Sequence, residues 1–137
     1  MKTSLVVTKI QTLLAAALTP TTVVEAFDLT HDLTDEQVAV ECSASTELRN
    51  AAGLPVAWRV NARCQAATHK DDDEDGSTRR GLIDGIAAWA ATVAASTLSV
   101  TGYMCDGVVS IDPDESAEVG ENYVGQAIRI EMMYSAT

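Results

Sequence analysis

The chain has 137 residues, of which 47% are hydrophobic and 21% are charged, and its formal net charge is −11. This length provides one hydrophobic core, and the composition is that of a globular rather than a disordered chain. Twenty acidic residues against nine Lys and Arg argue against a protein that binds duplex DNA or an anionic membrane surface, because both draw their affinity from clustered cations.

The first residues predict an amphipathic helix over 3–18 rather than a cleaved signal peptide. Thr8, Lys9 and Gln11 interrupt the apolar run that a signal peptide needs. At helical spacing the apolar residues share one face, and Pro20 predicts that the helix stops before it. The residues of this face are Val6, Ile10, Leu13, Leu14 and Ala17.

Alternating apolar and polar residues predict four strands. The alternation is longest in PVAWRVNARCQAAT, where Arg59, Asn61 and Arg63 occupy the polar positions. In GYMCDGVVSI, Val109 and Ile111 are expected to point into the core. The four strands are expected at about 38–46, 55–68, 103–111 and 122–134.

Between the second and third strands, the sequence predicts a helix over 78–98, because Leu82, Ile86, Trp89 and Val93 recur at intervals of three and four. The order is then helix, strand, strand, helix, strand, strand. Two pairs of strands with intervening helices are typical of an α+β fold. We expect a single domain over residues 1–137 with an antiparallel sheet and both helices packed on one face.

The stretch HKDDDEDGSTRRGL, residues 69–82, resembles a calcium loop in its first half. Asp71, Asp73 and Asp75 stand at the first, third and fifth loop positions, and Gly76 stands at the sixth, where the loop turns sharply. The twelfth position, which normally supplies a bidentate Glu, is Leu82. We interpret the stretch as a solvated acidic loop, and calcium binding stays open as an alternative.

Catalysis has little support in the sequence. Cys42, Cys64 and Cys105 lie far apart without a C-x-x-C pair, which predicts buried, reduced thiols rather than a zinc site. Cys105 and His69 form a conceivable nucleophile and base, but nothing in the sequence brings them together. No nucleotide-binding or hydrolase motif is present, so we expect no cofactor and no enzymatic activity.

Arginines on the polar faces of the strands suit contacts between subunits instead. Arg59 and Arg63 lie on the outer face of the long second strand, and Arg129 lies on the polar face of the last strand. Charged residues of this kind often fix the register between copies in an assembly. We therefore select these three residues as candidate interface residues.

The predicted elements are carried by five stretches, TKIQTLLAAAL, VAVECSAST, AWRVNARCQA, GLIDGIAAWAATVA and YVGQAIRIEMMY. Their order and pattern resemble those of tail terminator proteins of long-tailed bacteriophages. The resemblance covers nearly the whole chain and lies in its pattern rather than in a signature motif. Instead of a short connection, this chain has THKDDDEDGSTRR before its second helix, so another neck protein, a head-completion protein and a tail-tube relative stay open as alternatives.

The resemblance implies a structural protein of the virion, made in the host cytoplasm and located at the neck of the tail. Such a protein forms a hexameric ring that caps the tail tube and joins it to the head connector. DNA passes through the ring without specific binding, and neither a membrane nor a cofactor is involved. The acidic loop would then face the lumen or another exposed surface through Asp71, Asp72, Asp73, Glu74 and Asp75.

Overall fold

The computed structural model describes residues 2–18, 22–24, 37–42, 46–49, 55–113, 117–119 and 122–137. In these residues two α-helices and a 3-10 turn accompany seven strands. No helix in the described ranges is both long and apolar enough to span a membrane. In chain order the elements are α1 (Thr3–Ala17), β1 (Thr22–Val24), β2 (Gln37–Cys42), β3 (Thr46–Arg49), β4 (Pro55–His69), α2 (Ser77–Thr92), η1 (Ala95–Leu98), β5 (Tyr103–Pro113), β6 (Ala117–Val119) and β7 (Tyr123–Ala136).

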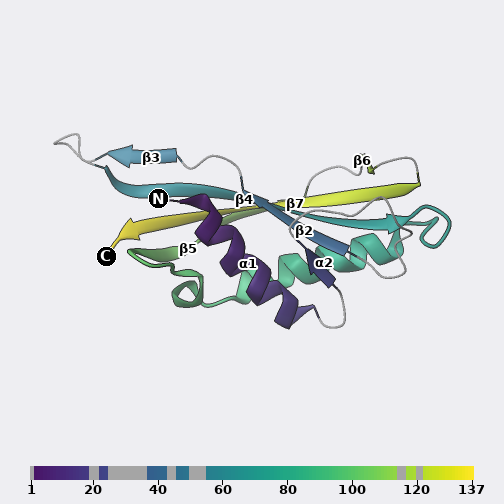
Figure 1. Ribbon diagram of the computed structural model, residues 1–137, viewed down its shortest axis with the longest axis horizontal. Coiled ribbons are helices and arrows are strands. Elements are labelled where there is room, and N and C mark those ends of the chain that lie inside the picture. Colours follow the sequence, from purple (N-terminus) through teal and green to yellow (C-terminus); the bar gives the residue numbers. More distant parts are fainter. Residues whose placement is uncertain are drawn as a thin grey trace.

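The strands form one mixed sheet in the order β1-β2-β4-β7-β5. The short strands β3 and β6 lie outside this order and pair with β4 and β7 respectively. All neighbours are antiparallel except β1 and β2. The two long strands β4 and β7 form the centre of the sheet, and their pairing continues from Ala57 opposite Ser135 to His69 opposite Tyr123 (Figure 1).

Alternation along the central strands puts one of their faces against the helices. In β4 this inner face is made of small and branched side chains, and in β7 it is made of larger ones, so the two strands complement each other in volume. Buried residues of both helices belong to the same core cluster. The core residues of these four elements are Val60, Ala62, Cys64 and Ala66 from β4, Ile128, Ile130, Met132 and Tyr134 from β7, Val6, Ile10 and Leu14 from α1, and Ile83, Ile86 and Ala90 from α2.

The α+β class with two helices is as expected, but strand order and helix packing differ from the simple α-β-β-α-β-β arrangement. The sheet is mixed because β1 runs parallel to β2, and the stretch 25–36 between them is long enough for the crossover that a parallel pair requires. The helices also divide the sheet between them: α1 packs on β1 and β2, and α2 packs on β4, β5 and β7 (Figure 1).

The second helix ends earlier than the expected 78–98. It stops at Thr92, and Val93 and Ala94 adopt extended conformations before the 3-10 turn η1. Leu98 is fully buried although it lies in this turn. The apolar periodicity of the sequence therefore continues past the end of α2 at Thr92. The 3-10 turn η1, rather than a further turn of α2, carries Leu98 into the core.

Val109 is also placed differently from the expectation. Its side chain is 55% exposed, while Val108 packs against the core. The reason is a register shift between Val108 and Ser110, which leaves Val109 without a partner on β7. Such a β-bulge reverses the alternation of side chains from that point, and the sequence pattern alone does not contain it.

Candidate functional site

The face of the sheet opposite the helices, which we call the open face, carries the three arginines selected from the sequence. Arg59 and Arg63 belong to β4, and Arg129 belongs to β7. They occupy the positions between the buried residues of these strands, so they point away from the core. The side chains of Arg59 and Arg63 are 45% and 34% exposed.

Acidic residues accompany these arginines on the open face. The Nε atom of Arg59 lies 2.8 Å from Oε1 of Glu131 on the neighbouring strand β7. The Nη1 atom of Arg63 lies 3.6 Å from Oε2 of Glu41 on β2, and it also donates a hydrogen bond of 3.2 Å to Oε1 of Gln65. These exposed pairs contribute little to stability, about 0–1 kcal/mol each. Their main effect is to fix where charge lies on the face.

The sheet register aligns four charged residues in one row across the open face. Glu41 on β2 is opposite Arg63 on β4, Arg63 is opposite Arg129 on β7, and Arg129 is opposite Asp112 on β5. Two arginines thus lie next to each other at the centre of the row, with one acid at each end. Like charges directly opposite on neighbouring strands are unfavourable, and the flanking acids offset this repulsion.

Among the residues that the structure describes, the paired positions of the open face carry three arginines and three acids. The chain as a whole has nine Lys and Arg against twenty acids and a formal charge of −11. The described part of the open face is therefore less acidic than the average of the chain. The charged residues of the face are Arg59, Arg63, Arg129, Glu41, Glu131 and Asp112.

The acidic loop 71–75 has one member that is not exposed. Asp73 is buried, with 4% of its surface accessible, and it caps the start of α2. Its Oδ1 atom accepts a hydrogen bond from the amide of Thr78 at 3.0 Å. Its Oδ2 atom accepts hydrogen bonds from the Thr68 hydroxyl at 2.9 Å, the Arg79 amide at 3.1 Å and Nη1 of Arg79 at 3.3 Å.

These contacts keep Asp73 ionised. Burial alone would raise the pKa of Asp73, but the hydrogen bonds from the Thr78 amide, the Thr68 hydroxyl and the Arg79 amide, together with the Arg79 charge, lower that pKa below its ordinary value. Gly76 makes the turn into the helix possible with a φ of 75°. A Cβ at this position would lie 2.6 Å from Nη2 of Arg79.

The expectation that all five acids of the loop are exposed is therefore wrong for Asp73. Asp71, Asp72, Glu74 and Asp75 are exposed. Both oxygens of Asp73 are already engaged by hydrogen-bond donors, one of them a guanidinium that would repel a cation. Among the residues that the structure describes, no group of three or more His, Cys, Asp or Glu is arranged to hold a metal ion. The geometry thus gives no support to the calcium alternative.

The three cysteines are free and point into the core. Burial raises the pKa of Cys42 and of Cys64 to about 12, and in Cys64 the nearby Cys42 adds to the effect. Burial also raises the pKa of Cys105. A nucleophilic cysteine needs the thiolate form, so these environments disfavour covalent catalysis.

Cys105 and His69 are not neighbours. Cys105 is opposite Tyr134 near one end of β7, and His69 is opposite Tyr123 at the other end. At about 3.3 Å per residue, these positions on β7 lie roughly 35 Å apart. His69 instead stacks edge-on against Tyr123, and its Nδ1 accepts a hydrogen bond from the Asp71 amide at 3.2 Å. Cys105 and His69 therefore cannot act together as nucleophile and base in one subunit.

No family model matches the chain, and no curated protein matches its sequence.

Sequence reasoning selected the arginines of the open face but missed their acidic partners. Glu41 and Glu131 stand at polar positions of their strands, so alternation could have placed them on the same face. Asp112 was missed because the expected strand 103–111 ended one residue before it, whereas β5 continues to Pro113. The row itself depends on strand register, which one sequence does not reveal.

Proposed function

We propose that the chain is a structural protein that assembles with copies of itself through the open face of its sheet. The observation that carries this proposal is the balanced charge at the described positions of the open face, in a chain whose formal net charge is −11. Two copies that each carry a net charge of −11 repel each other. A face with equal numbers of both signs is where this repulsion is smallest and where opposite charges of two copies can meet.

Within this class, we propose a tail terminator of a long-tailed bacteriophage. The support is the resemblance in element order and in the strand and helix stretches, together with an α+β fold in which both described helices pack on the same face of the sheet. In the proposed role, a hexameric ring caps the tail tube and joins it to the head connector at the neck of the virion. One ring surface matches the last ring of the tube, and the other does not recruit a further tube subunit.

The exposed acids of the loop fit passage of DNA through such a ring. Asp71, Asp72, Glu74 and Asp75 present negative charge to solvent, so they repel phosphates instead of binding them. Another neck or head-completion protein, or a relative of the tail tube, shares these requirements. Addition of the purified protein to polymerising tube subunits separates the roles, because a terminator shortens the tubes, a tube relative joins them, and another neck protein leaves their length unchanged.

The assembly itself is tested by Arg63→Glu. This change puts three acids and one arginine in the row, so we expect native mass spectrometry to show loss of the ring in favour of the monomer. Arg80→Glu is the matched control, because Arg80 is an exposed arginine on α2 outside the open face. A wild-type protein that is monomeric both alone and with tube and neck proteins would contradict the proposal, as would an Arg63→Glu protein that assembles like the wild type.

A further inference from the structure

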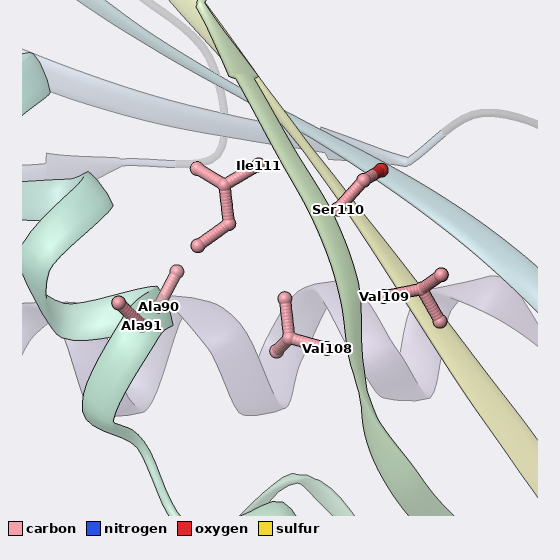
Figure 2. Close-up of a pocket in the computed structure, with 6 residues that line it drawn as sticks. All are labelled: Ala90, Ala91, Val108, Val109, Ser110 and Ile111. Atoms are coloured by element: carbon pink, nitrogen blue, oxygen red, sulfur yellow. The ribbon is translucent and has the colours of Figure 1, made fainter.

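An apolar groove lies between the end of α2 and the edge strand β5 (Figure 2). Its volume is about 190 Å³. In Figure 2, Val108 and Ile111 point toward the helix, where small alanine side chains leave the space open, and Val109 points away from it. The residues that line the groove are Ala90, Ala91, Val108, Val109, Ser110 and Ile111.

The strand beside the groove forms an edge of the sheet. β5 is the last strand in the order, and none of the described strands pairs with its outer side. Register shifts leave Asp106 and Val109 without an opposite residue in the ladder with β7, although the Ser135 hydroxyl on β7 donates a hydrogen bond to the Asp106 carboxylate. These irregularities disfavour long, regular pairing with another chain, so a partner would engage only the short stretch around Val109. Val109 is also the most exposed of the large apolar side chains in the described part of the protein.

Charge decides which kind of partner fits this edge. Asp106 and Asp112 are both exposed, and each lies three residues from Val109. In an antiparallel pair of two β5 strands centred on Val109, Asp106 of each copy would face Asp112 of the other. Like charges directly opposite are destabilising, which argues against a second copy at this edge. An apolar residue flanked on each side by a cation three residues away matches the same edge.

We propose that the β5 edge and its groove bind an extended segment of a different protein, with one apolar residue flanked by Lys or Arg three positions away on each side. The backbone of the segment pairs with β5 around Val109, and its cations face Asp106 and Asp112. An apolar side chain next to the paired stretch enters the groove between Val108, Ile111 and the alanines of α2. Strand addition of this kind takes its affinity from the backbone and its selectivity from side-chain pockets. The proposal shares Asp112 with the open face, but its groove and its backbone pairing belong to the β5 edge, so it can be tested separately from the proposed assembly.

Two synthetic peptides test the charge requirement. The first is the heptapeptide KTVVVTK. The second, ETVVVTE, has Glu in place of both Lys residues. Fluorescence anisotropy should show binding of the basic peptide at least about tenfold tighter than that of the acidic one. Hydrogen–deuterium exchange should show protection of the 103–113 amides by the basic peptide. Equal binding of both peptides, or protection only outside β5, would overturn the proposal.

Matched variants test the groove. Ala91→Phe fills it from an exposed position on α2, so we expect the basic peptide to bind about fivefold or more weakly. Ala88→Phe adds the same side chain at an exposed position of α2 that does not line the groove, and it should bind like the wild type. Asp106→Asn with Asp112→Asn should reduce the preference for the basic peptide. The proposal would be overturned if both Phe variants weakened peptide binding equally. It would also be overturned if self-association of the protein without peptide protected the β5 amides from exchange.

Discussion

Asp73 holds the start of α2 through both of its carboxylate oxygens. Thr68 reaches it from the end of β4, and Thr78 and Arg79 reach it from the first turn of the helix. The loop 71–75 is therefore attached to a strand and a helix by its middle residue, while the acids on both sides remain in solvent. A run of acids that looks uniform in the sequence contains one residue with a structural role.

Replacing Asp73 by Ala should lower the free energy of unfolding by about 2–4 kcal/mol. The change removes a buried acceptor and leaves the Thr68 hydroxyl and the Arg79 guanidinium without this partner in a site of low exposure. Urea denaturation measures the loss. Asp72→Ala, at the exposed neighbouring position, is the control and should change stability by less than about 0.5 kcal/mol. Similar losses in the two variants would contradict the assigned role.

The same residue predicts a dependence of stability on pH. The pKa of Asp73 in the folded protein lies below its ordinary value of about 3.9, so the unfolded chain takes up the proton first as the pH falls. The stabilising contribution is complete above the ordinary pKa and is lost as the pH falls through the folded-state pKa. In urea unfolding, the advantage of the wild type over Asp73→Asn should shrink between about pH 5 and pH 2. An advantage that grows on acidification would contradict this sign.

At the scale of elements, Tyr134 links the central strand β7 to the turn that follows α2. Its hydroxyl donates a hydrogen bond of 2.8 Å to the carbonyl of Leu98, and both residues are fully buried. This bond satisfies a carbonyl of η1 in the core, where water cannot replace the donor. The turn therefore has a fixed place on the sheet even though it contains few residues.

Tyr134→Phe should lower the free energy of unfolding by about 1–2 kcal/mol, because the Leu98 carbonyl loses its buried donor. Amide exchange of Ser99, whose N–H donates to the carbonyl of Ser96 at the end of η1, should become faster. Tyr103→Phe is the control, since its ring packs edge-on against Trp58 at 5.1 Å and Phe retains that contact. A larger loss in the control would contradict the role of Tyr134.

The apolar periodicity of the sequence predicted best the elements that have one face in the core and the other face outside it. Thr3–Ala17 lies where the helix over 3–18 was expected, and β4 and β7 lie along the longest alternating stretches. Features that depend on a partner strand could not be predicted, namely the parallel β1, the bulges that expose Val109, and the charged row. Asp73 was equally hidden, because its hydrogen bonds to Thr68 and Arg79 come from the fold and not from its neighbours in the run.

At the scale of the whole molecule, different kinds of surface lie on different parts of the fold. The core lies between the sheet and the helices, the open face carries balanced charge, and the acidic loop lies at the junction of β4 and α2. The β5 edge combines exposed apolar side chains with acids. Different surfaces are thus suited to different partners: the open face to another copy, and the β5 edge to a basic segment. A ring that must join a tube to a connector needs distinct surfaces of this kind.

The central position of β7 has a consequence for the synthesis of the protein. β7 pairs with β4 on one side and with β5 and β6 on the other, yet it leaves the ribosome after all of these partners. Until Tyr123 and the residues after it have emerged, β4 has no partner along one edge and β5 has none along its paired side. The nascent chain therefore exposes long, partly apolar strand edges, the state in which aggregation competes with folding. Slow folding dominated by contacts between distant residues is the expected result.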